Sequence, residues 1–312
     1  MRIFGPIPSR RLGQSLGINN IPPKVCTYSC VYCQMGRTKK MQHERAEFYN
    51  PETLFEEARE KIENLKKAGE SIDFITFVSD GEPTLDINLG KEIELLKSFG
   101  VKIAIITNAS LLWMEDVRLD LIDADLVSIK IDSVEEKIWR QIDRPHGYLN
   151  IQKILEGIQE FAKVFKGTLA TETMLVDGIN DNESSIEKTA EFISKLKPTK
   201  PYILVPTRPP GEDWVRQPKK VTIEKACQIF RDKITSPVIC MADDEENKFF
   251  VDKNIAEDLL SITSVHPMKE EVIKQLLNEK NSDWSLVQNM IDNNLLEEMV
   301  FQGLKFYKRK TK

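Results

Sequence analysis

Short runs of β-branched and aromatic residues alternate with amphipathic stretches through the middle of the chain. The candidate strands are Phe74–Val78, Lys102–Thr107, Leu126–Ile131, Thr168–Val176 and Tyr202–Val205. The helical stretches around them are Pro51–Lys67, Lys91–Phe99, Ile151–Phe165 and Glu183–Leu196. Strands and helices that alternate at this spacing form βαβ units with a parallel sheet, which right-handed crossovers curl toward a barrel. The pattern predicts an α/β fold whose functional groups gather at the carboxyl ends of the strands.

The pattern changes beyond about residue 255. Two short helices and a hairpin around Gln302-Gly303 are predicted there, over Met268–Asn278, Trp284–Asp292, Leu295–Met299 and Leu304–Tyr307. The acidic run 243–247 is typical of a solvated connection. We therefore expect a core domain over residues 1–245 and a small winged-helix-like domain over residues 255–312. Such modules bind nucleic acid or mediate protein contacts, and eight basic against nine acidic residues over 255–312 leave both open.

Composition favours a soluble, cytoplasmic protein. Hydrophobic residues make up 41% of the 312 residues and charged residues 30%, and no apolar run approaches the roughly 18 residues that span a membrane. The net charge of −5 is unevenly distributed, because residues 1–45 carry eight basic side chains against Glu44 alone. This basic segment is either a solvated face or a surface for an anionic substrate or a phosphate backbone.

Three of the five cysteines stand close together, as Cys26, Cys30 and Cys33. This C-x3-C-x2-C spacing offers three thiolates and no nearby fourth ligand, which fits an iron–sulfur cubane with one iron left open. A zinc site completed by Cys227, Cys240 or His43 is the alternative. We expect no disulfide, because five cysteines is an odd number and the N-terminus lacks the apolar region of a secretory signal. Cys227 and Cys240 are expected to be small buried residues.

Polar residues follow or interrupt the predicted strands. The segment Ser79–Leu85 follows one strand, and Asn108 ends the next. Ser128, Lys130 and Asp132 alternate along one face of a third strand. Because a buried parallel strand is normally apolar, we expect these three side chains to face inward toward a bound cofactor. A strand whose polar face lies in water is the alternative.

Together, the cysteine spacing and the polar strand ends resemble the radical S-adenosylmethionine (radical SAM) superfamily over most of residues 1–245. The resemblance implies a partial (β/α)6 barrel, a [4Fe–4S] cluster on the three cysteines, and SAM as the second cofactor. Enzymes of this superfamily cleave SAM reductively to a 5′-deoxyadenosyl radical that abstracts hydrogen from a substrate. An electron donor such as ferredoxin or flavodoxin is implied as a partner.

The resemblance also assigns cofactor contacts. Tyr32 matches the aromatic position near the SAM adenine. Asp80-Gly81-Glu82-Pro83 is similar to the Gly-Gly-Glu-Pro segment that meets the SAM amino group, with Asp80 departing from the first glycine. Asn108 matches a strand end close to SAM, and the strand that meets the SAM carboxylate and ribose supplies Ser128, Lys130 and Asp132. A lysine beside a carboxylate suits a zwitterionic ligand.

Two further motifs, at residues 5–13 and 205–210, resemble a branch related to the wyosine tRNA-modifying synthase. One departure is plain: that synthase holds a second cluster on cysteines upstream of its triplet, whereas this chain has no cysteine before Cys26. The synthase also takes pyruvate onto a lysine, for which Lys130 is a candidate beside its SAM-binding role. Because the two motifs resemble this branch, RNA modification is the leading specific hypothesis.

Other polar residues are candidates for the substrate. Arginine recognises carboxylate or phosphate groups well, and four arginines lie in loops on the expected active face: Arg10, Arg11, Arg144 and Arg208. Together they favour an anionic substrate. His146 is either a general acid or base or a hydrogen-bonding loop residue.

We predict a radical SAM enzyme of oxidoreductase or transferase type that acts on an unidentified substrate. One alternative is a modifier of a metabolite, peptide or protein. The other is an iron–sulfur redox-sensing regulator that reads a target through its C-terminal domain.

Overall fold

The computed structural model describes residues 2–241, 255–265 and 267–310. Its centre is an eight-stranded sheet in the order β1-β2-β5-β6-β7-β8-β9-β10. The strands are β1 Ile3–Ser9, β2 Gly13–Ile18, β5 Phe74–Phe77, β6 Lys102–Thr107, β7 Leu126–Lys130, β8 Thr168–Met174, β9 Lys200–Leu204 and β10 Ile239–Met241. Every neighbouring pair is parallel except β1 with β2. The sheet is open, because β1 and β10 form its two edges.

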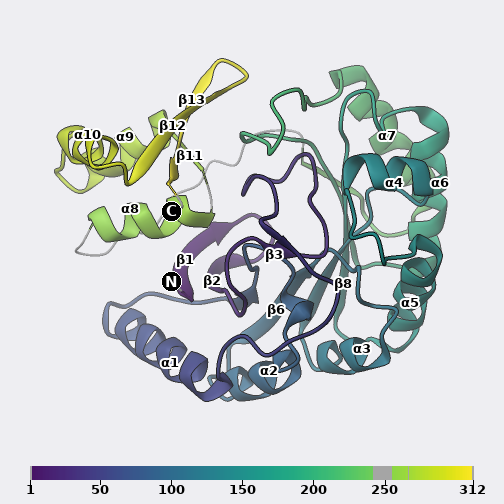
Figure 1. Ribbon diagram of the computed structural model, residues 1–312, viewed down its shortest axis with the longest axis horizontal. Helices are drawn as coiled ribbons and strands as arrows, with labels where there is room; N and C mark the ends of the chain where they lie inside the picture. Colours follow the sequence, from purple (N-terminus) through teal and green to yellow (C-terminus); the bar gives the residue numbers. More distant parts are fainter. Residues whose placement is uncertain (1, 242–254, 266, 311–312) are drawn as a thin grey trace.

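Helices pack along the outside of this sheet, as Figure 1 shows. They are α1 Pro51–Lys67, α2 Leu89–Lys97, α3 Glu115–Leu121, α4 Glu136–Ile142, α5 Ile151–Val164, α6 Glu183–Leu196 and α7 Lys220–Lys233. Asn50, Asn150 and Asn182 cap the first turns of α1, α5 and α6 through their side-chain oxygens. The apolar helix faces and the strands form one continuous core. Its packing fixes the strand ends in place.

The predicted α/β fold with a parallel sheet is confirmed. Each strand and helix predicted in the core domain is present, with ends that differ by a few residues. The hairpin of β1 and β2 was not predicted, because Pro6 and Pro8 argue against a strand. The structure places both prolines in the edge strand β1, where a missing amide donor is tolerated.

The remainder forms a C-terminal module, which we define as residues 255–265 and 267–310. Its elements are α8 Ile255–Val265, β11 Met268–Lys269, α9 Glu270–Glu279, α10 Ser285–Asp292, β12 Leu296–Phe301 and β13 Leu304–Arg309. The strands form an antiparallel sheet in the order β11-β13-β12. The two predicted helices and the hairpin are present, while β11 occupies the predicted start of the first helix. The winged-helix assignment stays a prediction, and the predicted connection 243–247 lies outside the described residues.

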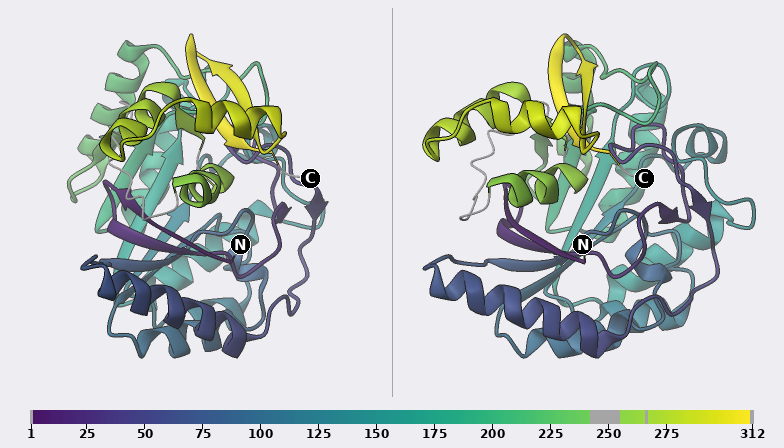
Figure 2. Two further views of the ribbon diagram at one scale, coloured as in Figure 1. Left: turned by 90° about the vertical axis from the view of Figure 1, so that its left-hand side faces the viewer. Right: turned by 60° about the vertical axis from the view of Figure 1, so that its left-hand side comes forward.

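The C-terminal module has its own core and packs against the N-terminal hairpin. Ile273, Val287 and Tyr307 are among its buried residues, and Ile7 of β1 packs against them. Gln217 donates a hydrogen bond to Gln302 across 2.9 Å. Figure 2 shows the module beside β1. No helix among the described residues is long and apolar enough to cross a membrane.

A disulfide joins Cys227 of α7 to Cys240 of β10. The expectation of no disulfide was therefore wrong. The two cysteines are 13 residues apart in sequence, but α7 folds back onto the sheet and brings their Cα atoms to 6.3 Å. That proximity comes from the packing of a helix on the sheet edge, which cysteine counting does not reveal.

Candidate functional site

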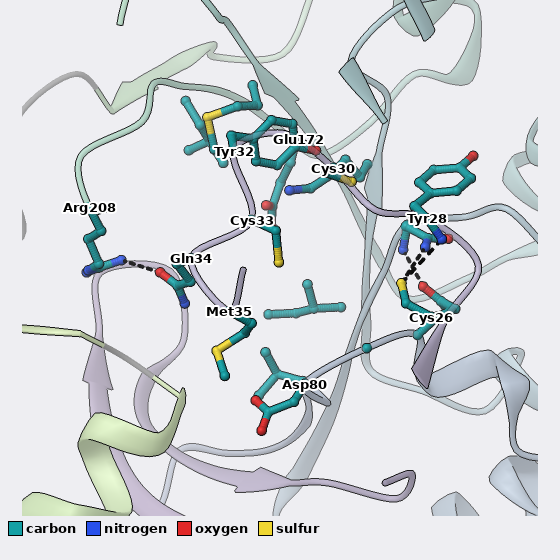
Figure 3. A pocket seen from close by; sticks show the side chains of 18 of the residues that line it. Cys26, Tyr28, Cys30, Tyr32, Cys33, Gln34, Met35, Asp80, Glu172 and Arg208 are labelled. Carbon is teal, nitrogen blue, oxygen red and sulfur yellow. Dashed lines mark hydrogen bonds between the residues drawn. The ribbon is translucent and has the colours of Figure 1, made fainter. Parts of the chain in front are cut away.

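A cavity of about 330 Å³ opens at the carboxyl ends of the parallel strands. Its wall combines the three cysteines of the N-terminal triplet with residues in or just after the carboxyl-terminal parts of β5, β6, β7, β8, β9 and β10. Figure 3 shows Cys33 pointing its thiol into the middle of this space, with Cys26 and Cys30 to one side and Asp80 across from it. The cavity therefore joins the cysteine motif to the polar strand ends.

The cysteine loop, which we define as residues 24–38, carries the three free thiols. It contains the short strand β3 Val25–Cys26, which pairs with β4 Lys40–Met41. Cys26 Sγ accepts weak hydrogen bonds from the Tyr28 amide and from Asn108 Nδ2, at 3.5 and 3.6 Å. Cys30 donates to Asp143 across 3.3 Å. Protein contacts thus fix two of the thiols.

Burial favours the protonated form of the Cys26 and Cys30 thiols. Burial, with the Glu82 carboxyl nearby, raises the pKa of Cys26 to about 12. Burial and Asp143 also raise the pKa of Cys30 well above its ordinary value. A metal replaces such protons when it binds. Among the residues that the structure describes, no three His, Cys, Asp or Glu side chains converge on one point as ligands of a single ion.

The donor set nevertheless fits a [4Fe–4S] cluster. Three free thiols line one cavity. The remaining two cysteines are joined in a disulfide. Three thiolates leave one iron of a cubane without a protein ligand, and the cavity extends beyond the thiols to polar groups that suit a second ligand. The residues present therefore match both cofactors that the sequence predicts.

Gly81 lets the segment after β5 lie directly against the cysteine loop. The Lys24 amide donates to the Asp80 carbonyl across 2.7 Å, and the Glu82 amide donates to the Val25 carbonyl across 3.2 Å. A Cβ atom on Gly81 would lie 1.8 Å from that Val25 oxygen. Only glycine permits this approach of two backbones. Glycine is therefore required at position 81 for steric reasons.

Glu82 organises the strand ends. Its carboxylate is 1% exposed and accepts hydrogen bonds from the Thr84 amide, the Thr107 hydroxyl at 2.6 Å and the Asn108 amide at 2.7 Å. Burial raises the pKa of Glu82, while these donors partly offset the shift. The structure therefore places Glu82 as a brace that positions Asn108, with its oxygens engaged by protein donors.

Lys130 and Tyr32 form another part of the cavity wall. The Lys130 ammonium lies 4.8 Å from the centre of the Tyr32 ring. The Tyr32 hydroxyl donates to Asp132 and lies 3.3 Å from Asp143. Burial alone would lower the pKa of Lys130, but Asp132 and Glu172 raise it above its ordinary value. Lys130 therefore presents a cation to the cavity.

Ser128 and Asp132 lie behind this wall. Neither is among the described residues that line the cavity. Ser128 donates to Glu172 across 2.7 Å, and Asp132 accepts from the Met174 amide across 2.7 Å. The alternation of this strand thus gives one side chain to the cavity, and the other two hold its neighbours. Ser128 and Asp132 thus support two residues of the cavity wall, Glu172 and Tyr32.

The predicted substrate residues divide into two groups. Arg10, Arg11 and Arg208 line the cavity, and Arg11 forms an ion pair with Glu172. Arg144 pairs with Glu212 and is not among the described lining residues. His146 is not among them either.

His146 instead stacks on His43 at 4.6 Å between ring centres. Its Nδ1 accepts a hydrogen bond from the Tyr148 amide at 3.3 Å. This arrangement favours the interpretation of His146 as a hydrogen-bonding loop residue.

Sequence reasoning missed Glu172 and Asp143. Glu172 lies inside the strand β8 and is 4% exposed, so a charge within a predicted strand was the available signal. Although burial alone would raise the pKa of Glu172, Arg11 and Lys130 lower it. Asp143 follows α4, and no pattern separates it from an ordinary helix end.

The family of the chain follows from comparison. The model of the radical SAM superfamily matches residues 20–193, which contain the three cysteines and the strand-end residues up to β8. The chain belongs to the radical SAM superfamily.

Within it, the UPF0026 protein MJ1312 of Methanocaldococcus jannaschii is 51% identical over 99% of the chain and 96% of its own length. The chain therefore belongs with the UPF0026 proteins.

Two more comparisons are informative. A protein named GTPase Obg from Brachyspira hyodysenteriae is 31% identical over 98% of the chain, which spans only 45% of that relative. A solved structure described as TYW1 with a lysine-pyruvate adduct bound shares 20% identity, with a TM-score of 0.51 over 74% of this chain and 76% of that one. That likeness shows a common fold.

A buried acid of α2, outside the cavity lining, gives a pH prediction. Glu92 of α2 is fully buried, and burial and Asp86 raise its pKa from 4.5 to about 8. The folded protein then binds more protons than the unfolded chain between these values, so stability should fall as pH rises from 4.5 to 8. Glu92→Gln should raise the free energy of unfolding at pH 8.5 by about 2 kcal/mol and change it little at pH 4.

Urea denaturation at the two pH values measures this effect. The exposed neighbour Glu94, changed to Gln, is the matched control and should leave both free energies unchanged. An E92Q protein with the same pH dependence as the unchanged protein would show that Glu92 is not the group that titrates.

Proposed function

We propose that the protein binds a [4Fe–4S] cluster on Cys26, Cys30 and Cys33 and uses it to cleave SAM in the adjoining cavity. The observation that carries this proposal is the meeting of three free thiols with the polar strand ends at one cavity. When bound, cluster and SAM supply a 5′-deoxyadenosyl radical, which abstracts hydrogen from the substrate. The protein binds, orients and shields these groups.

Individual residues have distinct tasks in this proposal. Lys130 holds an anionic group of SAM, since its ammonium faces the cavity. Tyr32 offers its ring to the adenine and is fixed by Asp132 through its hydroxyl. Gly81 and Asp80 present backbone groups beside Cys26, and Glu82 fixes Asn108 at the next strand end.

For the substrate we propose an anionic molecule, with RNA as the leading class. Arg10 and Arg208 line the cavity, and residues 1–45 carry the excess of basic charge. The structure of TYW1 with a lysine-pyruvate adduct raises the question of whether Lys130 has such a role. A lysine must be neutral to attack a carbonyl, whereas Asp132 and Glu172 raise the pKa of Lys130. We therefore assign Lys130 to SAM.

The C-terminal module is proposed as a winged-helix-like unit. Its three helices precede or flank a three-stranded antiparallel sheet, and the β12–β13 hairpin turns at Gln302 and Gly303, both with positive φ. We propose a reducing cytoplasm as the place of action, since the cluster thiols require it. A ferredoxin or flavodoxin is the proposed electron donor.

The substrate class is tested with the anaerobically reconstituted protein, SAM and a reductant. Host RNA, a small-molecule extract and a protein extract are added in parallel, and 5′-deoxyadenosine is measured. We expect RNA to stimulate its formation and to yield a nucleoside of new mass. Stimulation by one of the other fractions alone would overturn the RNA proposal in favour of a metabolite, peptide or protein substrate.

A further inference from the structure

A lysine of the C-terminal module reaches into the core domain beside the cysteine loop. Lys308 lies in β13 and is only 8% exposed. Its Nζ donates a hydrogen bond to the backbone carbonyl of Gln34 across 3.0 Å. Gln34 directly follows Cys33, and both line the cavity. Because a buried ammonium is costly, its placement at this carbonyl needs a compensating partner.

The surroundings of Lys308 include a second buried lysine and one shared carboxylate. Lys24 is 7% exposed and lines the cavity. Burial lowers the pKa of Lys24 to about 8, and repulsion from Lys308 contributes. The Asp80 carboxylate raises the pKa of both lysines. Exposed Glu297 of the neighbouring β12 acts on Lys308 only.

One carboxylate, that of Asp80, acts on both buried lysines, whereas Glu297 acts on Lys308 from the exposed surface. Burial raises the pKa of Asp80 to about 6. Asp80 stands where the related motif has glycine, so this chain supplies a carboxylate where the motif supplies none. Because Gln34 directly follows Cys33, the Lys308 ammonium lies beside the cysteine loop. A [4Fe–4S] cluster with three thiolates is anionic and would give both buried lysines a further compensating charge.

We propose that Lys308 is a positioning residue of the cluster site: it fixes the Gln34 carbonyl and places a buried cation beside the cluster. This inference deepens the proposed function and rests on it. Reduction adds negative charge to the cluster, so a nearby cation favours the reduced form. The C-terminal module is therefore part of the redox site, whatever else it binds.

The test compares Lys308→Met, Lys308→Arg and Lys310→Met in the full-length reconstituted protein. Lys310 is exposed and donates to Asn294 within the module, which makes it the matched control. The reduced cluster is quantified by electron paramagnetic resonance at fixed solution potentials. We expect K308M to lower the ratio of reduced to oxidised cluster about tenfold, equal to about 59 mV for one electron. K308R and K310M should keep the original ratio.

If Lys308 had only a structural role, K308M would not change the ratio of reduced to oxidised cluster. A K308M cluster with the original ratio overturns the proposal, as does an equal shift in K310M. If K308M loads less iron while K308R loads fully, the positioning role is supported. Thermal unfolding checks that the C-terminal module is folded in each variant. If it is folded and both K308M and K308R lose iron while K310M loads fully, the electrostatic role is overturned.

Failure of the proposed function would be separately visible. If the unchanged protein binds no iron, the proposed cluster function is wrong. Hydrogen exchange on the apoprotein then still tests whether Lys308 positions the cysteine loop. K308M should then raise the exchange of residues 33–38 several-fold while K308R and K310M should not. Unchanged exchange would contradict the positioning of the cysteine loop by Lys308.

Discussion

Replacing Cys26, Cys30 or Cys33 singly by alanine is expected to abolish SAM cleavage and remove most of the bound iron. Two thiolates cannot hold a [4Fe–4S] cluster in place of three, and no other free cysteine exists to substitute, because Cys227 and Cys240 are bonded to each other. Iron analysis, visible absorbance and 5′-deoxyadenosine formation measure the effect. We expect 5′-deoxyadenosine formation by each variant to fall to the level of a protein-free blank, because the cofactor that carries the chemistry is lost.

The double variant Cys227→Ala/Cys240→Ala is the matched control. It removes the same kind of side chain from α7 and β10, away from the triplet. Its iron content should equal that of the unchanged protein. A colourless preparation that contains zinc and no iron, with the triplet intact, would contradict the cluster assignment and favour the zinc alternative.

The second large effect is expected from Gly81→Ala. The new methyl group would lie 1.8 Å from the Val25 carbonyl oxygen, so the backbones around Asp80 and Lys24 must separate. Their mutual hydrogen bonds would be lost with that movement. We expect the free energy of unfolding of the apoprotein to fall by about 3 kcal/mol or more, and iron loading to fail. Urea denaturation and iron analysis provide the measurements.

Gly147→Ala provides the control for this change. A Cβ atom on Gly147 meets no heavy atom within 4 Å, so the same substitution has open space there. Its stability and iron content should match those of the unchanged protein. A G81A protein as stable as G147A would mean that the close approach of the two backbones is not required for folding.

Local pattern was sufficient to predict the core of the fold. The runs around Ile75, Ile105 and Val127 are apolar because their strands are buried on both faces, and the helices between them show one apolar stripe each. Such signals act over a few residues and are readable without a tertiary structure. The regular spacing of strands and helices then leaves few arrangements other than a parallel sheet.

Features that depend on distant contacts were not predictable. The hairpin of β1 and β2 carries Pro6 and Pro8, which are acceptable only because β1 is an edge strand. The disulfide requires α7 to pack beside β10. Lys308 looks like one member of a basic tail in the sequence, and only the docking of β13 buries it at Gln34.

The candidate site was predicted in its outline more than in its contacts. The spacing of the three cysteines and the glycine at position 81 could both be recognised in the sequence, and these residues line the same cavity. Glu82 lines the cavity and Asp132 does not, and oxygens of both accept hydrogen bonds from protein donors. Their contacts with SAM stay predictions. A sequence motif shows that a polar residue is needed at a strand end. It does not show whether the residue contacts a ligand or holds the residue that does.

Formation of 5′-deoxyadenosine from SAM tests the central claim most directly. The measurement uses the anaerobically reconstituted protein with its cluster reduced, and the Cys33→Ala variant as a blank. We predict 5′-deoxyadenosine above the blank even before the substrate is identified, because the three thiols and the strand ends proposed to bind SAM line one cavity. No SAM cleavage with any added fraction, by a protein with an intact and reducible cluster, would contradict the account and favour the redox-sensing regulator.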